Sequence, residues 1–136
     1  MKNIILLLVS SSIILLSSCK KNTATIDSND QYYVKYEVNS STIYTGRKLE
    51  VLLRSDNNQI IKDTINARSP WEMTIGPVNR GFNANIQVNE IVDNYGHLTL
   101  QSQISISKNS SAFALKASDN SSTPRTSVQI GYSINY

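Results

Sequence analysis

The chain has 136 residues, a formal net charge of +3 and 40% hydrophobic residues. This length is enough for one domain with one modest core. One cysteine excludes an intramolecular disulfide and one histidine excludes a histidine metal cluster, so we expect no cofactor and no metal site.

The first nineteen residues, MKNIILLLVSSSIILLSSC, have the composition of a secretory leader. Lys2 supplies a positive start, and residues 4–16 form an apolar stretch interrupted by three serines. A thirteen-residue helix would rise about 20 Å, which is short of the hydrocarbon core of a bilayer. The segment therefore predicts a leader that is removed rather than a permanent membrane span.

The tetrapeptide Leu16-Ser17-Ser18-Cys19 resembles the lipobox of bacterial lipoproteins. The resemblance implies cleavage between Ser18 and Cys19, thioether lipidation of Cys19 and acylation of its new amine. Residues 1–18 would then be a lipoprotein signal peptide, and the protein would be lipid-anchored in the cell envelope, in the outer membrane, with its domain in the periplasm or at the cell surface. The alternative is an ordinary leader in which the cysteine has no role.

Residues 19–31 are polar and show no hydrophobic periodicity, which predicts a flexible lipidated tether. Twelve such residues span about 20 Å in root-mean-square terms, enough to hold a small domain above a headgroup layer.

From Tyr32 onward the hydrophobic pattern has a period of two, which predicts β-strands rather than helices. Clusters of Asn, Ser, Asp, Gly and Pro separate the alternating segments and predict turns. The segments expected to form strands are 32–38, 49–54, 59–65, 71–75, 82–88, 98–107, 112–117 and 127–136.

Residues 49–54 and 59–65 flank the turn cluster Ser55-Asp56-Asn57-Asn58, which predicts a hairpin. Asp63 falls on the same strand face as two isoleucines, so the sequence leaves the register of this hairpin open.

One apolar and one polar face per strand is the pattern of an antiparallel sheet with one solvated side. Two such sheets facing each other hide both apolar faces, so we expect an all-β, antiparallel β-sandwich of about seven or eight strands, immunoglobulin-like, over residues 32–136. Trp71 is expected to fill the core; the alternative is a surface aromatic that stacks on a ligand.

Three segments, YYVKYEVNSSTIYT, SPWEMTI and GFNANIQV, resemble a pattern in small lipoproteins of Bacteroidetes-like bacteria that are related to the MmpS family of membrane-anchored accessory proteins. The resemblance covers most of residues 32–136. It implies a small β-sandwich outside the cytoplasm and service to a membrane transport complex. No catalytic residue is carried over. This chain has a lipobox in place of the spanning helix of that family.

Catalytic patterns are weak in this sequence. His97 lies near Asp93 in a predicted loop, but no nucleophile motif accompanies them. The glutamates Glu37, Glu50, Glu72 and Glu90 fall mostly on predicted outward strand faces. We therefore expect a protein that is not an enzyme. The positive charges are scattered and form no basic stripe, so we also expect no nucleic-acid partner.

The sequence thus favours a non-enzymatic interaction or accessory module with an envelope protein or a glycan as possible partner. The alternative function is a surface lipoprotein that binds carbohydrate or another small ligand. Tyr33, predicted outward on its strand, and Tyr44 and Tyr95, both in predicted loops, are the candidate contact patch. Asp63-Thr64-Ile65 resembles an acceptor motif for O-glycosylation, with Thr64 as the acceptor.

Overall fold

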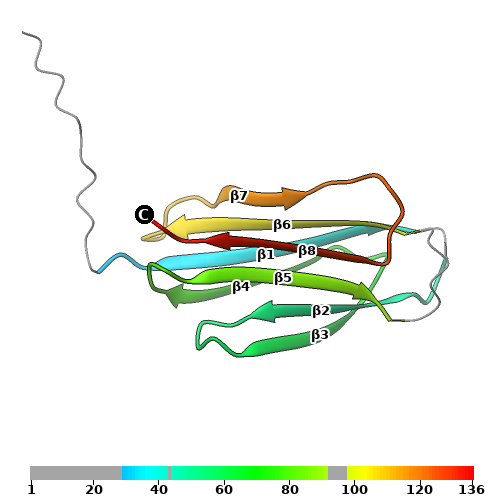
Figure 1. Ribbon diagram of the computed structural model, residues 1–136, viewed down its shortest axis with the longest axis horizontal. Helices are drawn as coiled ribbons and strands as arrows, with labels where there is room; N and C mark the ends of the chain where they lie inside the picture. Colours follow the sequence, from blue (N-terminus) through cyan, green and yellow to red (C-terminus); the bar gives the residue numbers. More distant parts are fainter. Residues whose placement is uncertain (1–28, 43, 92–97) are drawn as a thin grey trace, which may run out of the picture.

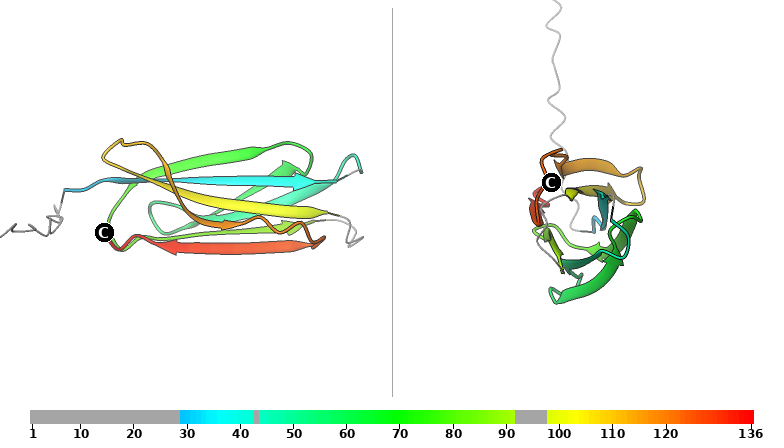
Figure 2. Two further views of the ribbon diagram at one scale, coloured as in Figure 1. Left: turned by 90° about the horizontal axis from the view of Figure 1, so that it is seen from above. Right: turned by 90° about the vertical axis from the view of Figure 1, so that its right-hand side faces the viewer.

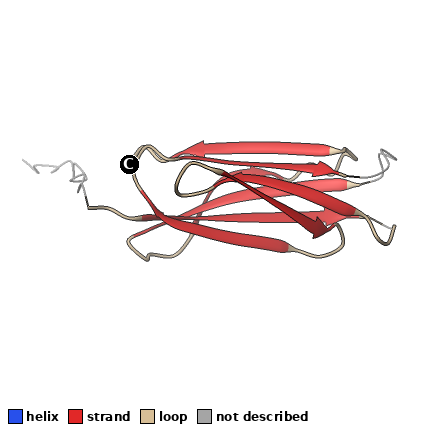
Figure 3. Ribbon diagram, turned by 90° about the horizontal axis from the view of Figure 1, so that it is seen from below, coloured by secondary structure: helices blue, strands red, loops and turns tan. Residues whose placement is uncertain are grey.

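The computed structural model describes residues 29–42, 44–91 and 98–136, and within them it contains eight β-strands and no helix (Figure 1). Every regular element of the described chain is a strand (Figure 3). The strands are β1 (Tyr32–Ser41), β2 (Lys48–Arg54), β3 (Ile60–Asn66), β4 (Trp71–Val78), β5 (Asn83–Glu90), β6 (Thr99–Lys108), β7 (Ala114–Asp119) and β8 (Ser127–Ser133).

The strands form two four-stranded antiparallel sheets that pack face to face (Figure 2). The first sheet has the order β4-β1-β6-β7 and the second the order β3-β2-β5-β8. This architecture confirms the expectation of an all-β, antiparallel sandwich. It arises because each strand carries one apolar face, and facing sheets remove both apolar faces from water.

All odd-numbered strands run one way and all even-numbered strands run the other way, so the sandwich has two distinct ends. The end where β1 begins also carries turns 55–59, 79–82 and 109–113 and the last residues of the sequence; we term it the proximal end (Figure 1). The opposite, distal end carries the start of β2 and connections 67–70 and 120–126.

The core lies between the sheets and is built from alternate residues of nearly every strand. Tyr32, Val34, Tyr36 and Val38 of β1 are at most 1% exposed, and β1 is paired on both sides, with β4 and β6. The remaining core side chains are mainly Leu, Ile and Val, which pack without polar atoms. The other fully buried large residues are Leu49, Val51, Leu53, Ile86, Leu98, Leu100, Ile104 and Ile134.

Several strands extend beyond the expected bounds because tertiary pairing overrides local turn signals. β1 continues through Asn39 and Ser40 to Ser41, where it still pairs with β6. β4 continues through Gly76 and Pro77, which the sequence had suggested as a turn. Gly76 has φ +135°, and a Cβ there would lie 2.8 Å from the carbonyl oxygen of Tyr32, so only glycine fits against β1.

The open register of the predicted hairpin is settled by a contact between the sheets. β2 and β3 pair so that Asp63 lies opposite Val51 and faces inward. The indole Nε1 of Trp71 donates a hydrogen bond of 3.0 Å to Asp63 Oδ2. Trp71 is half-buried against the core rather than central to it, and it joins edge strand β4 to edge strand β3. An inward acidic residue is tolerated here because it has this donor.

The first described residues are held against the proximal end. Asp30 forms a salt bridge of 2.5 Å with Lys108 and accepts a hydrogen bond of 2.8 Å from Asn109. The hydrogen bond from Lys108, followed by that from Asn109, lowers the pKa of the Asp30 carboxyl group below its usual value. Beside this group the rings of Tyr32 and Tyr136 meet edge to face, with centroids 6.0 Å apart. The chain therefore enters the domain next to the place where the sequence ends.

Burial of Tyr36 predicts a loss of stability at alkaline pH. Desolvation raises the pKa of its hydroxyl group well above the usual 10.0, so the folded state keeps it neutral. In the unfolded chain the Tyr36 hydroxyl ionises near pH 10. Its contribution to the free energy of unfolding is therefore complete below that pH and falls by about 1.4 kcal/mol per pH unit above it. Tyr36→Phe should flatten this decline, measured by urea denaturation between about pH 8 and about pH 11. Equal slopes for both chains would contradict the assignment.

Candidate functional site

The outer face of the second sheet is lined with side-chain amides. Strand β5 points Ala84, Ile86 and Val88 into the core, so the residues between them point to solvent. These residues lie opposite equally polar or side-chain-free positions of β8. The strip consists of Asn83, Asn85, Gln87 and Asn89 on β5, facing Ser133, Gly131, Gln129 and Ser127 on β8.

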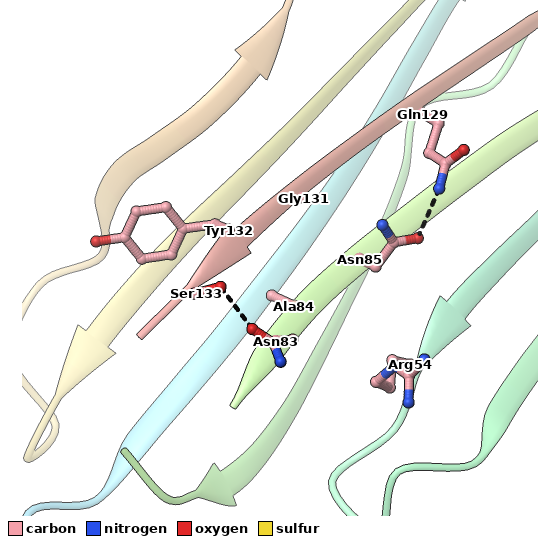
Figure 4. A pocket seen from close by; sticks show the side chains of 8 residues that line it. All are labelled: Arg54, Asn83, Ala84, Asn85, Gln129, Gly131, Tyr132 and Ser133. Atoms are coloured by element: carbon pink, nitrogen blue, oxygen red, sulfur yellow. Dashed lines mark hydrogen bonds between the residues drawn. The ribbon is translucent and has the colours of Figure 1, made fainter. Parts of the chain in front are cut away.

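An open depression of about 420 Å³ lies on this face (Figure 4). A smaller one of about 90 Å³ adjoins it, since both are lined by Arg54 and Asn85. Together they extend the site from β8 across β5 to β2. The larger depression is lined by Arg54, Asn83, Ala84, Asn85, Gln129, Gly131, Tyr132 and Ser133. Besides Arg54 and Asn85, the residues that line the smaller one are Leu52, Leu53, Ile60 and Gln87.

Gly131 explains why the face is hollow at this point. It pairs with Asn85, and a Cβ at position 131 would lie 3.3 Å from Asn85 Nδ2. Because glycine has no side chain, the Asn85 amide lies over the neighbouring strand. It accepts a hydrogen bond of 3.5 Å from Gln129 Nε2, while Ser133 donates to Asn83 (Figure 4).

The lining of the depression is suited to hydrogen bonding rather than to proton transfer. Each amide offers two donors and two acceptor lone pairs, more than its single drawn contact uses. The eight lining residues include no carboxylate and no histidine, and Arg54 is their one cation. Tyr132 pairs with the buried Ala84 and its ring points away from Asn85 and Arg54 (Figure 4), so its hydroxyl does not face the depression. The site can therefore hold a polar, mainly uncharged ligand.

The predicted tyrosine patch is spread over the molecule. Tyr33 is half-buried on the outer face of β1 at the proximal end. Tyr44 is 43% exposed at the distal end, with the guanidinium of Arg47 4.8 Å from its ring centroid. The nine strand residues from Tyr33 to Ser41 alone span about 26 Å. Tyr95 lies outside the described residues. Tyr33 and Tyr44 therefore do not contribute to one surface.

A buried ion pair at the distal end was missed by sequence reasoning. The side chain of Glu90 is fully buried and that of Arg47 is 8% exposed, and the two form a salt bridge. Glu90 was expected on an outward face with the other glutamates. It lies at the end of β5, where it continues the inward face of Ile86 and Val88 and pairs with the buried Leu49 of β2. Only the tertiary structure shows its partner, because Arg47 precedes β2 and lies 43 residues earlier in the sequence.

Most other predicted sites fall outside the described residues. These are the signal peptide with Ser18 and Cys19, and the loop residues Asp93 and His97. Thr64 is exposed on edge strand β3. None of the described residues forms a helix long and apolar enough to cross a membrane. In the same part of the chain, no group of three or more His, Cys, Asp or Glu residues is placed to hold a metal ion.

Comparison of the sequence with models of known protein families and with curated proteins found no match. The depression on the second sheet is therefore the feature on which a functional argument rests.

The buried pair predicts strong energetic coupling between Arg47 and Glu90. Arg47→Met leaves the Glu90 carboxylate buried without its counterion and should cost about 3–5 kcal/mol of unfolding free energy. The double variant with Glu90→Met should recover most of this loss, because it removes the uncompensated charge as well.

The exposed pair of Lys62 and Glu50 provides the control. Lys62→Met should change the unfolding free energy by no more than about 1 kcal/mol. Denaturant titrations of the four chains measure all three effects. Glu90→Met alone completes the cycle, and a double variant whose loss equals the sum of the two single losses would show that the pair is not coupled.

Proposed function

We propose that this protein is a non-enzymatic, lipid-anchored lipoprotein of the cell envelope whose β-sandwich acts as an interaction module. Support for the anchor comes from Leu16-Ser17-Ser18-Cys19 and from Cys19 being the only cysteine. Support for the module comes from the structure beyond it: within the described residues, eight strands and one core lie between Tyr32 and Ile134. The proposed arrangement is a globular domain on a short tether, at the outer membrane.

The amide-lined depression is the observation that favours a binding role. Concave sites with converging polar groups are the usual places where proteins hold small ligands. Asn and Gln side chains both donate and accept, so they match the hydroxyl groups of a sugar, which do the same. Arg54 at the rim adds a contact for one acidic substituent. The ligand class that fits best is therefore a neutral or singly acidic glycan.

We further propose that the fold is immunoglobulin-like, on the basis of strand order. Taking β1, β2, β3, β4, β5 and β8 as strands B, C, C′, E, F and G reproduces the neighbours B–E, C–C′, C–F and F–G of an immunoglobulin variable-type sandwich. The hairpin of β6 and β7 then takes the position of strand A beside β1. In this reading the binding face is the C′-C-F-G sheet.

The resemblance to MmpS-related proteins supports a narrower proposal, service to a membrane transport complex. In that case the face formed by β2, β5 and β8 would contact a protein or would hand over a ligand to one. A transporter gene beside the gene for this protein would support it, and crosslinking in cells followed by pull-down would identify the partner.

Lipidation at Cys19 is tested by metabolic labelling with an alkyne fatty acid. The unsubstituted chain should carry the label and sediment with membranes. Cys19→Ala should lose the label, because the thioether and the acylated amine both depend on this residue. The intact mass of the purified protein should also lack residues 1–18. A chain with Met1 retained, or with an unmodified thiol, would contradict the anchor.

Ligand recognition is tested on an array of neutral and acidic glycans. Asn85→Ala removes a central amide, and Gly131→Thr fills the depression while keeping a residue suited to a strand. Each should weaken binding by at least about tenfold, the effect of one lost hydrogen bond of about 1.4 kcal/mol. Gln101→Ala changes an amide on the outer face of the other sheet and should leave binding unchanged. Equal binding by all four chains would place the ligand elsewhere, and no binding at all would count against the glycan proposal.

A further inference from the structure

The outer face of the first sheet is apolar at its proximal end. Phe113, just before β7, is 42% exposed and Leu115 on β7 is 55% exposed. Leu115 shares a register row with Ser105 of β6 and Lys35 of β1. Tyr33 is the next residue of β1 on the same face, two residues nearer the proximal end than Lys35, and it pairs with Ser107. We define Tyr33, Lys35, Phe113 and Leu115 as the proximal patch.

The large side chains of this patch enclose two small ones. Ser105 and Ser107 point to the outer face, yet they are only 6% and 2% exposed. They are sheltered because β6 lies between Tyr33 and Lys35 on one side and the start of β7 on the other. The ammonium group of Lys35 lies 5.7 Å from the centroid of the Phe113 ring, and this contact crosses β6 from β1 to the start of β7. The patch is thus a connected surface rather than a set of isolated apolar residues.

Charge is distributed unevenly along the same face. Beyond the patch toward the distal end, Glu37 of β1 lies opposite Glu72 of β4. The patch itself carries one cation, Lys35. Two further lysines lie at the proximal end but not on this face: Lys108 pairs with the inward-facing Tyr32, and Lys116 alternates with Leu115 on β7 and has its ammonium group 4.8 Å from the Tyr136 ring centroid. Lys35 forms a salt bridge with Glu37, and Lys108 forms one with Asp30.

The patch lies at the end where the chain enters the domain. Asp30 is fixed to that end by Lys108 and Asn109. Only ten residues separate Asp30 from Cys19, which is about 17 Å in root-mean-square terms for a flexible chain. A lipid on Cys19 would therefore hold the proximal end close to the headgroups, and the distal end would lie farther from them.

We propose that the proximal patch rests on the anionic bilayer that holds the Cys19 anchor. Tyrosine and phenylalanine beside lysines match an interface in which rings meet acyl chains and ammonium groups meet phosphates. The inference depends on the proposed anchor. It also orients the domain, because the outer faces of the two sheets point in opposite directions. With the first sheet toward the bilayer, the amide-lined depression on the second sheet faces away from it and is open to ligands.

The chain is well suited to a test by cysteine labelling, since its only native cysteine would be occupied by lipid. An environment-sensitive fluorophore is attached to Leu115→Cys in the lipidated full-length product, reconstituted in vesicles of phosphatidylglycerol and phosphatidylethanolamine that contain a nitroxide-labelled lipid. The matched control carries the same fluorophore on Thr64→Cys, which is exposed on the outer face of the second sheet. Quenching by the nitroxide lipid should be several times stronger at position 115 than at position 64.

A second variant separates the patch from the anchor. Phe113→Ser in the Leu115→Cys background should reduce the quenching at position 115, although the protein still sediments with the vesicles. Equal quenching at positions 115 and 64 in sedimented protein would overturn the patch proposal and leave the anchor standing; a protein partner would then be the candidate occupant. Failure of the unsubstituted protein to carry lipid and to sediment would overturn both proposals.

Discussion

The alternation of β1 is the constraint on which the rest of this fold depends. Its residues Tyr32, Val34, Tyr36 and Val38 all point into the core, and its backbone pairs with β4 on one side and β6 on the other. A shift of one residue in either pairing would move these four side chains to solvent. It would also move Tyr33, Lys35 and Glu37 into the core. The register of the first sheet, and through it the position of Asp30 beside Tyr136, is therefore tied to this strand.

Because each strand has one inward face, the sandwich presents two outer faces, and these differ in chemistry. The face of the second sheet is rich in amides and hollow beside Gly131. The face of the first sheet carries exposed Phe113 and Leu115 near the proximal end. A domain tethered at that end can use one face toward a membrane and the other toward a ligand without either contact obstructing the other. This division is the structural basis of the two proposals made above.

Two polar groups, Asp63 and Glu90, have partners that sequence reasoning did not identify, and of the two only Glu90 was expected on the wrong strand face. Asp63 was placed on the apolar face of its strand, where it does lie, and the indole of Trp71 on the other sheet supplies its hydrogen-bond donor. Glu90 was expected in water, but its partner Arg47 lies 43 residues earlier and both are buried together. In both cases a local pattern shows only which way a side chain points along its own strand. It does not show what covers that side chain.

The sequence by itself determined the strand content, most of the turn positions and the antiparallel two-layer class, because a period of two and its interruptions are local properties of the chain. It also supplied the lipobox resemblance and the polar segment after it. Only the tertiary structure decided the order β4-β1-β6-β7 and β3-β2-β5-β8, since pairing joins residues that are remote in sequence. The depression and the proximal patch follow from that order: Asn85 meets Gly131 across β5 and β8, and Lys35 shares a row with Leu115 across β1, β6 and β7. Neither surface exists within a single strand, so no local pattern could have predicted it.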